Sequence, residues 1–231
     1  MMEDMDMKRK ITACAAAAVT LLSLTGCGNA AKTYTDYVQS VLDCTYKNIT
    51  DKYMELTEST TEEASDVYQS EVDYMVQLIY YYYDVYEDYV DDSTKTGYEA
   101  LAKDILAKVN YTVEPAVRSG SSYHVTVTSQ PIDFWDITYD AVNELYDDKY
   151  ADRFLDESLS DEDYESAEGE WASDVLTTLS GYTSQIGYKD TQSTIVEITT
   201  ADDGTYGIDE KMWLDIDDLL LDVDGNISSD E

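Results

Sequence analysis

Four consecutive tyrosines, Tyr80 to Tyr83, are the most unusual run of side chains in this 231-residue sequence. A tyrosine ring offers a flat apolar face and a polar hydroxyl, which together suit it to pack against a sugar or a peptide. Successive residues of a helix point about 100° apart, so one core cannot bury all four rings. Two interpretations follow. Either two rings lie in the core and two are packed on neighbouring helices or half-exposed, or an aromatic wall forms in which Tyr80, Tyr81 and Tyr83 face a ligand.

Few side chains suit nucleophilic or acid–base catalysis. Cys44 lies in a helical pattern close to Val41, Leu42 and Ile49, and we expect it to be a buried apolar residue rather than a nucleophile. His124 is the only histidine, and it falls on an outward position of an alternating strand, where we expect it to face solvent. The sequence holds 50 acidic residues, so the spacing of any two carboxylates says nothing about glycosidase chemistry. We predict no catalytic residue.

The acidic run from Asp222 to Ser228 has part of the spacing of a calcium loop. Aligning Gly225 with the turn glycine of such a loop places four side chains on liganding positions: Asp222, Asp224, Ser228 and Glu231. The first ligand position would then fall on Leu220, which has no oxygen to offer, so we do not predict an EF-hand. The sequence also lacks a glycine-rich phosphate loop and the Cys and His groups of a zinc site. We predict no metal site and no cofactor, and at most weak calcium binding somewhere on the acidic surface.

The N-terminal segment has the parts of a bacterial export signal. The basic cluster Lys8 to Lys10 precedes an uncharged, mostly apolar run from Ile11 to Leu24, which is shorter than the roughly 20 residues of a membrane-spanning helix. The next tetrapeptide, Leu24-Thr25-Gly26-Cys27, resembles the lipobox of bacterial lipoprotein signals. The resemblance implies that Cys27 receives a diacylglyceryl group with acyl chains such as palmitate, and that the bond before it is cut. Acidic residues ahead of the basic cluster leave Met1 and Met7 as alternative starts.

This signal predicts how the chain is divided and where it is located. We expect four parts: a signal peptide over residues 1–26, a lipidated N-terminus and short tether over 27–33, a single domain over 34–222 and a frayed acidic tail over 223–231. Two acyl chains are enough for stable attachment. We therefore expect an extracytoplasmic protein held by lipid on the outer face of the cell membrane. Cys44 would be its one free thiol, without an intrachain disulfide.

The net charge of −36 restricts the partners of the chain. Nucleic acids and anionic lipid surfaces are bound through Lys and Arg, so neither is expected as a partner. The 22 tyrosines and the apolar periodicity do not fit a disordered chain. A solvated, self-repelling surface accounts for the charge, and cation binding, basic partners or adaptation to a salty habitat fit it as well.

Apolar residues recur at helical spacing in several stretches, and these predict helices over residues 34–46, 59–89, 98–106, 133–146, 160–179 and 212–219. Ser59 and Glu62 have the spacing of a capping box at the start of the second helix. Asp133 and Ser160 are expected to cap two later helices.

A period of two predicts two antiparallel hairpins between these helices. The first joins residues 109–113 to 123–127 through a turn at 118–121, and the second joins 194–200 to 205–208 through Asp202-Asp203-Gly204. Pro115 places the first strand at an edge of the sheet or beside a bulge. The predicted fold class is α+β, with several amphipathic helices packed on a curved antiparallel sheet built from two hairpins.

This order of elements resembles small cell-surface lipoproteins of unknown function from Gram-positive bacteria. The resemblance rests on the early stretch YVQSVLDCTYKNITDKYMELT, the strand pattern at 123–127 and the closing DDGTYGID, and it covers most of residues 34–220. It implies an NTF2-like domain, a cone-shaped α+β fold in which helices pack into a curved sheet. The long helical insertion between the hairpins departs from that compact pattern. NTF2-like proteins include enzymes and binding domains, so this fold does not fix a function.

Three functions remain open from the sequence. The first is a non-catalytic, membrane-tethered binding or scaffold domain whose partner is a peptide, a glycan or another envelope protein. The second is an extracytoplasmic hydrolase that uses acidic residues in the concavity of the sheet. The third is a structural spacer without a ligand.

Overall fold

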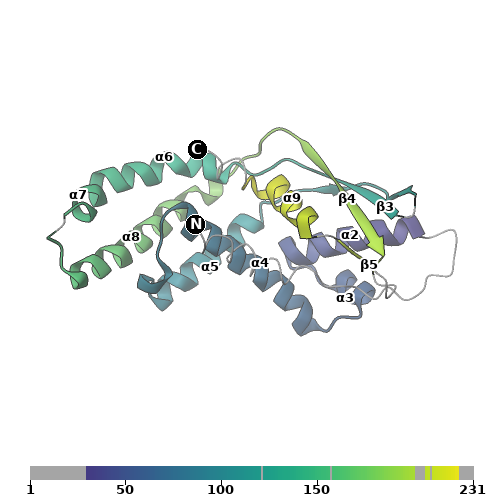
Figure 1. The fold of residues 1–231 in the computed structure, drawn as a ribbon, viewed down its shortest axis with the longest axis horizontal. Coiled ribbons are helices and arrows are strands. Elements are labelled where there is room, and N and C mark those ends of the chain that lie inside the picture. The colour runs from purple at the N-terminus through teal and green to yellow at the C-terminus, as the bar shows by residue number, and fades with distance from the viewer. Residues whose placement is uncertain (1–29, 121, 157, 201–205, 209, 224–231) are drawn as a thin grey trace. The chain divides into compact units, whose positions relative to one another are not determined.

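The computed structural model describes residues 30–120, 122–156, 158–200, 206–208 and 210–223 (Figure 1). The expected signal peptide, the lipobox residues Leu24, Thr25 and Gly26, and the lipidation site Cys27 lie outside these residues. The same holds for residues 224–231 of the expected acidic tail. All of these stay predictions.

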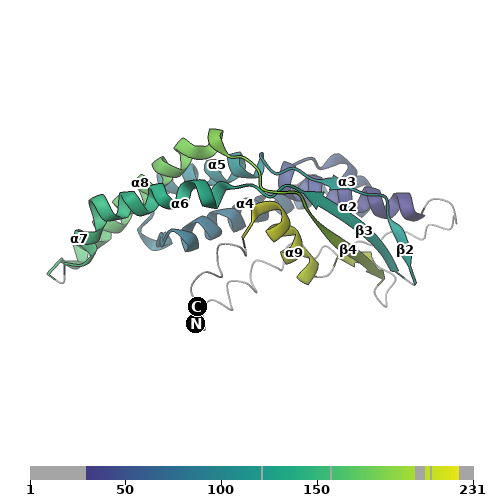
Figure 2. The same ribbon diagram turned by 90° about the horizontal axis from the view of Figure 1, so that it is seen from above.

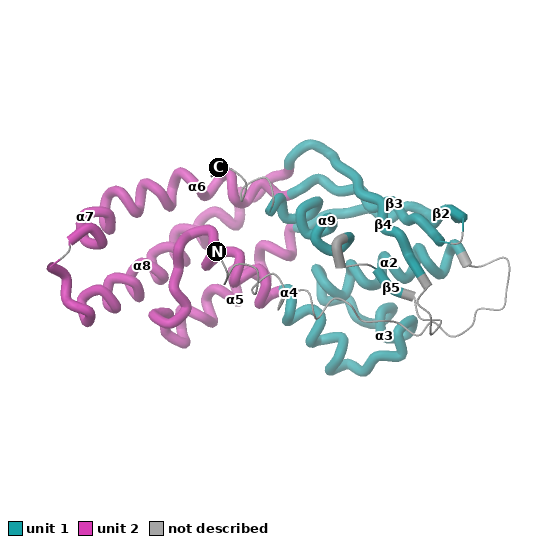
Figure 3. Tube along the Cα trace, in the orientation of Figure 1, with its two compact units in different colours: residues 1–71, 109–131, 189–223 teal, residues 72–108, 132–188, 224–231 magenta. Residues whose placement is uncertain are grey.

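Two compact units divide the described residues (Figure 3). Unit 1 holds residues 30–71, 109–131 and 189–223, whereas unit 2 holds residues 72–108 and 132–188. Each unit is built from stretches that are distant in the sequence, and helix α4 (Thr61–Tyr82) belongs to unit 1 up to Glu71 and to unit 2 from Val72. The expectation of one domain over residues 34–222 stays a prediction.

Unit 1 combines helices with a five-stranded antiparallel sheet. Besides the first half of α4, its helices are α2 (Ala30–Lys47), α3 (Asp51–Thr57) and α9 (Glu210–Leu221). Its strands are β1 (Thr112–Val113), β2 (Val117–Ser119), β3 (Ser122–Ser129), β4 (Gln192–Thr200) and β5 (Tyr206–Ile208). The strand order is β1-β3-β4-β5, and β2 pairs with β3 on the same side as β1.

Both predicted hairpins are present, and the long pair β3–β4 joins them. The first turn is shorter than predicted, because Arg118 and Ser119 belong to β2 and pair with β3. Pro115 lies in the gap between β1 and β2, on an edge of the sheet, as its missing N–H group predicts. Helices packed with a curled antiparallel sheet confirm the predicted α+β class. The NTF2-like resemblance stays a prediction.

The core of unit 1 lies between the sheet and its helices. Along β3 and β4 the inward residues are fully or almost fully buried: Val125, Val127, Val196 and Ile198. Helix α2 contacts β3, and α9 contacts β4 (Figure 2). The apolar face of α2 consists of the residues predicted from helical spacing, namely Tyr34, Tyr37, Val38, Val41, Leu42 and Tyr46. Side chains alternate between the two faces of a strand, and they recur on one face of a helix every three to four residues. These two periods place the apolar faces of the sheet and the helices against each other.

Unit 2 is built mainly from helices. After the second half of α4 it contains the 3₁₀ turn η1 (Glu87–Tyr89), α5 (Asp92–Leu106), α6 (Phe134–Leu145), the π-helical segment η2 (Tyr146–Tyr150), α7 (Ala151–Phe154), α8 (Asp161–Tyr182) and η3 (Thr183–Gln185). Helix α8 contacts both α5 and α6. The hydroxyl of Tyr98 on α5 donates a hydrogen bond of 2.7 Å to the carbonyl of Ala172 on α8. None of the described helices is both long and apolar enough to span a membrane.

Helix α4 differs from its prediction at both ends. It begins at Thr61 instead of Ser59. Its capping box lies one residue later than predicted, because it is formed by Thr60 and Glu63: the Thr60 N–H group donates to Glu63 (2.7 Å) and the Glu63 N–H group donates to Thr60 Oγ1 (3.2 Å). It ends at Tyr82 instead of Tyr89, because Asp84 adopts a left-handed conformation with φ of 49°. The chain then leaves the helix axis.

Other helix starts follow the sequence in part. Ser160 caps α8 as predicted, since its hydroxyl accepts the Asp163 N–H group at 3.2 Å. Asp133 precedes α6, but its carboxylate accepts the Gly187 N–H group at 2.7 Å instead of capping the helix. The expected tether is partly helical, because α2 already begins at Ala30, in a stretch of good helix formers.

Candidate functional site

The tyrosine run lies at the end of α4 and splits between core and surface. Tyr80 and Tyr83 are buried, and the Tyr80 ring meets the Tyr98 ring edge-on at 4.9 Å between centroids. Tyr81 is 47% exposed. Tyr82 is half-buried, with its ring centroid 4.8 Å from that of Trp135. This is the first of the two interpretations. Among the three tyrosines predicted to face a ligand, Tyr81 alone offers its ring to solvent, and a ligand there stays a prediction.

A second group of tyrosines, missed in the sequence, gathers where the loop after α4 crosses α8. We name it the Tyr164 cluster; it consists of Asp84, Tyr86, Tyr89, Tyr164 and Glu168. The loop approaches α8 closely at Gly169, where an added Cβ would lie 3.2 Å from the Tyr89 carbonyl oxygen. This approach places the rings of Tyr89 and Tyr164 6.2 Å apart at an interplanar angle of 85°. Tyr86 is 56% exposed and Tyr164 is 37% exposed, so two of the rings reach solvent.

Glu168 is the buried carboxyl of this cluster and is 4% exposed. One helical turn earlier on α8, Tyr164 donates a hydrogen bond from its hydroxyl to the Glu168 carboxylate. Burial raises the pKa of Glu168, the nearby charge of Asp84 raises it further, and the Tyr164 hydrogen bond opposes both effects. The same hydrogen bond is the main reason why the pKa of Tyr164 rises to about 12.

Aromatic side chains of α7, η2 and α8 pack next to the Tyr164 ring and against one another. The Tyr164 ring contacts Phe154 of α7 with centroids 5.8 Å apart. Phe154 stacks on Tyr150 at 5.7 Å, and Tyr150 meets Trp171 of α8 at 5.1 Å. The Trp171 indole N–H group donates to the Tyr83 carbonyl at 3.0 Å, which ties α8 to the end of the tyrosine run. The exposed Tyr164 ring therefore packs on the half-buried Phe154, behind which Tyr150 and Trp171 are buried.

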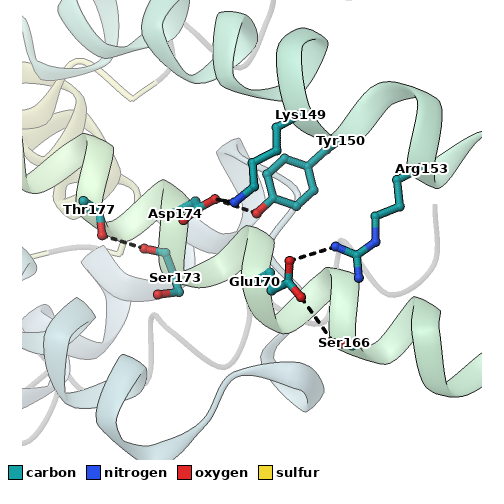
Figure 4. A network of polar contacts seen from close by, with 8 residues as sticks. All are labelled: Lys149, Tyr150, Arg153, Ser166, Glu170, Ser173, Asp174 and Thr177. Atoms are coloured by element: carbon teal, nitrogen blue, oxygen red, sulfur yellow. Dashed lines mark hydrogen bonds and ion pairs between the residues drawn. The ribbon is translucent and has the colours of Figure 1, made fainter.

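Polar contacts fix the π-helical segment and α7 onto α8 (Figure 4). Lys149 forms an ion pair with Asp174, which also accepts the Tyr150 hydroxyl at 2.7 Å. Arg153 forms an ion pair with Glu170 at 2.8 Å. These pairs occupy the two basic side chains that η2 and α7 bring to α8, and both use carboxylates other than Glu168.

Unit 1 contains a different acidic site, which we name the buried acid pair: Glu71 at the middle of α4, which is buried, and Asp217 on α9, which is half-buried. Tyr46 of α2 donates a hydrogen bond from its hydroxyl to Asp217. The Oε1 atom of Glu71 is buried and has no hydrogen-bond partner among the described residues. Burial, followed by the charge of Asp217, raises the pKa of Glu71 well above its usual range. Burial also raises the pKa of Asp217 to about 7, against the effect of the Tyr46 hydrogen bond.

The remaining predicted residues take structural positions. Cys44 is fully buried with Sγ 3.4 Å from the Ala64 carbonyl oxygen, and burial raises its pKa to about 11, so the expectation of a core thiol is confirmed. His124 lies outward on β3 as expected and faces Glu197 across the strands at 3.9 Å.

The proposed calcium-loop positions lie mostly outside the described residues. Asp222, which is described, forms an ion pair with Lys189. Asp224, Ser228 and Glu231 fall in the part of the chain that is not described. Across the described ranges, no group of three or more Cys, His, Asp or Glu side chains has the arrangement of a metal site.

Comparison with known proteins gives a structural match but no match to a family model or to a curated sequence. No protein-family model matches the chain, and no curated protein matches it in sequence. Among solved structures, the chain is similar to the crystal structure of a "putative lipoprotein (ycdA)" from Bacillus subtilis subsp. subtilis str. 168. The match has 12% sequence identity and a TM-score of 0.47, and it covers 84% of this chain. The chain spans 56% of the length of that protein.

Proposed function

We propose that this chain is an extracytoplasmic lipoprotein, held on the outer face of the cell membrane by a diacylglyceryl group on Cys27. The observation that carries the proposal is the tetrapeptide Leu24-Thr25-Gly26-Cys27 directly behind a basic cluster and a short apolar run. A lipid anchor needs no apolar membrane-binding surface on the folded part, because two acyl chains are sufficient for stable attachment.

Replacement of the anchoring cysteine tests this directly. In Cys27→Ala the acceptor thiol is gone, so we expect loss of fatty-acid labelling and loss of the protein from the detergent phase of a phase-partition assay. Cys44→Ala is the matched control, because it removes the buried cysteine of α2 and leaves the lipobox intact. A Cys27→Ala protein that still incorporates the fatty acid and still partitions into detergent contradicts the anchor.

For the folded part, the proposal is a non-catalytic binding or scaffold domain whose partner is a peptide, a glycan or another envelope protein. The exposed Tyr164 ring supports binding, because it packs on Phe154 and lies one helical turn from the buried Glu168. A thermal-unfolding screen of the purified full chain with short peptides, glycans, Ca²⁺ and Mg²⁺ tests it. A ligand at about 100 times its Kd stabilises by about 2.7 kcal/mol, which shifts the midpoint by several degrees.

The outcomes of that screen separate the proposals. A shift with one class of ligand supports a binding domain and names its partner class. A shift with Ca²⁺ but not Mg²⁺ supports the weak calcium site, whereas equal shifts with both cations reflect screening of the surface charge. The absence of any shift favours the structural spacer.

One observation favours a hydrolase as the second candidate. The buried acid pair holds a carboxyl with a strongly raised pKa beside a second carboxyl, as a general acid requires. Oε1 of Glu71, however, is closed to solvent in this structure. Hydrolysis of glycoside substrates by the wild-type chain, abolished in Glu71→Gln, would establish this second candidate, and absence of turnover removes it.

A further inference from the structure

The Tyr164 cluster combines aromatic faces with negative charge. The rings of Tyr89 and Tyr164 stand almost perpendicular at 6.2 Å. The side chain of Tyr86 lies close enough to interact electrostatically with the Tyr164 hydroxyl, and the charge of Asp84 acts on Glu168 in the same way. Two perpendicular rings can place two π faces around one cation, which binds a ring within about 6 Å of its centroid.

Within the described residues no basic side chain forms an ion pair with Glu168, and Lys95 of α5, which lies beside the loop, pairs with Glu87 at 3.7 Å. The titratable groups that act on Glu168 are Asp84 of the loop and Tyr164 of α8, and both are acidic groups. The basic residues of η2 and α7, Lys149 and Arg153, bind Asp174 and Glu170 instead. A buried carboxyl tends to keep its proton, and a cation beside it lowers the cost of its charged form. A ligand that brings a positive charge would supply that pairing.

The backbone at the cluster is built for a fixed geometry. Asp84 holds a left-handed conformation, which non-glycine residues adopt at an energetic cost. Gly169 lets the loop come within reach of α8. The rings are therefore held in place before any ligand arrives, which reduces the entropy lost on binding.

We propose that the Tyr164 cluster binds an organic ammonium group, with the rings of Tyr89 and Tyr164 around the cation and the carboxylates of Asp84 and Glu168 as its counter-charge. This inference rests on the proposed binding function and names the ligand chemistry of its site. An organic ammonium fits better than a metal ion, because tyrosine rings attract a weakly hydrated cation and offer few oxygen ligands. It fits better than a neutral sugar because a sugar has no positive charge to pair with the carboxylates of Asp84 and Glu168.

Calorimetric titration of the full chain, purified in a maltoside detergent, tests the proposal with matched ligands. Choline supplies a quaternary ammonium and Nα-acetyl-lysine methylamide supplies a primary one. The neutral alcohol in which carbon replaces the ammonium nitrogen of choline has nearly the same shape without the charge. We expect one or both cations to bind and the neutral alcohol not to bind. The stronger of the two cations indicates whether small quaternary ligands or lysine side chains are preferred.

Variants locate the site. Glu168→Gln keeps the shape and removes the charge, and we expect it to weaken binding at least about tenfold, as does Tyr164→Leu. The controls are Glu165→Gln, which removes an exposed carboxylate from the same helix, and Tyr139→Leu, which removes a ring that is 53% exposed elsewhere in unit 2. Both should bind as the wild type does. Burial raises the pKa of Glu168, so cation binding should also release protons, and the measured heat should depend on the ionisation enthalpy of the buffer.

Several results would overturn the inference. These are equal binding of choline and its neutral analogue, equal binding by the wild type and Glu168→Gln, or no binding of either cation. If neither cation binds while a peptide or glycan still shifts the unfolding midpoint in the screen, the ammonium site fails and the binding function stands. If no ligand of any class binds, both fail together.

Discussion

The buried acid pair of unit 1 and Glu168 of unit 2 are the same kind of group in two different positions. Glu71 is covered on α4, and the hydroxyl partner of Asp217, Tyr46, is itself buried. Glu168 is equally covered, but its hydroxyl partner Tyr164 is 37% exposed. In unit 1 the tyrosine bonds the half-buried Asp217 beside the buried Glu71, whereas in unit 2 it bonds the buried Glu168 itself. The two sites also differ in whether that tyrosine reaches solvent.

This difference decides what a raised pKa can do. In both sites removal of water from the carboxyl is the leading cause of the shift. In unit 1 the shift can act on the stability of the fold, because a ligand has no exposed ring through which to approach. In unit 2 a ligand that meets Tyr164 changes the surroundings of Glu168 directly. A carboxyl with a perturbed pKa points more strongly to a ligand site when the side chain bonded to it reaches solvent.

The largest expected effect is the pH dependence that the buried acid pair gives to stability. Both pKa values are raised by folding, so the folded chain keeps protons that the unfolded chain releases. The contribution of these groups is then fully present at acid pH and is lost as the pH rises from about 4, the unfolded value, towards the folded value of Asp217 at about 7. Unfolding by urea at about pH 5 and about pH 8 measures the loss.

Glu71→Gln removes one of the two titrating groups and keeps the side-chain shape. We expect the wild type to lose more free energy of unfolding than this variant between the two pH values, by at most about 4 kcal/mol, since one proton released over three pH units corresponds to about 1.4 kcal/mol per unit. Glu165→Gln, which changes an exposed carboxylate, should follow the wild type. Parallel losses in the wild type and Glu71→Gln would mean that the pair is not held in a dry environment.

The second effect comes from the crossing of the loop over α8. Gly169→Ala places a methyl group 3.2 Å from the Tyr89 carbonyl oxygen, so the loop must move away from the helix. The close contact costs about 1–3 kcal/mol and alanine in a helix offsets up to about 1 kcal/mol of that, so we expect Gly169→Ala to be less stable than Gly181→Ala by about 1–3 kcal/mol. We also expect weaker ammonium binding, because the movement separates the Tyr89 ring from the Tyr164 ring.

Gly181→Ala on the same helix is the control, since an added Cβ there meets nothing within 4 Å. It should stabilise the chain by up to about 1 kcal/mol, because alanine is the better helix former. Equal behaviour of the two alanine variants would show that the loop does not depend on the close approach at Gly169.

Much of the fold could be predicted from local patterns, and the errors have local causes. Alternating apolar residues in β3 and β4 and the helical spacing in α2 indicated the elements that form the core of unit 1. The capping box was misplaced by one residue because the sequence Ser59-Thr60-Thr61-Glu62-Glu63 contains two overlapping boxes, and periodicity cannot choose between them. The end of α4 was missed because Tyr86 and Tyr89 continue the helical spacing beyond the left-handed Asp84.

The acidic sites were harder to predict, yet the sequence contains a signal for them. Glu71 follows Ala64 by two helical turns, Asp217 follows Trp213 by one, and Glu168 precedes Trp171 by three residues, so each carboxyl interrupts the apolar face of its helix. An acidic residue at such a position must find a partner or keep a proton. Which tyrosine meets which carboxyl depends on packing between distant segments, as with Tyr46 and Asp217, and a single sequence does not show that pairing.

The smallest effect compares the two tyrosine hydroxyls. Tyr46→Phe removes the hydrogen bond that a fully buried hydroxyl donates to the half-buried Asp217 carboxylate, so at about pH 8 we expect a loss of about 1–2 kcal/mol. The loss should shrink at about pH 5, where Asp217 is protonated and its hydrogen bond from Tyr46 is weaker. Tyr164→Phe removes the equivalent bond to Glu168, but water can approach from the exposed side of the ring, so we expect less than about 1 kcal/mol.

Amide hydrogen exchange in α9 and α8 measures the two losses separately, because it reports local opening of each helix. If Tyr164→Phe lowers the amide protection of α8 more than Tyr46→Phe lowers that of α9, the Glu168 site is the drier of the two and the comparison is reversed. Solvent access would then not be what distinguishes the units, and the Tyr164 ring would belong to the structural core of unit 2. If the order is as expected, the Tyr164 hydroxyl can be removed at little structural cost, which leaves it free to respond to a ligand.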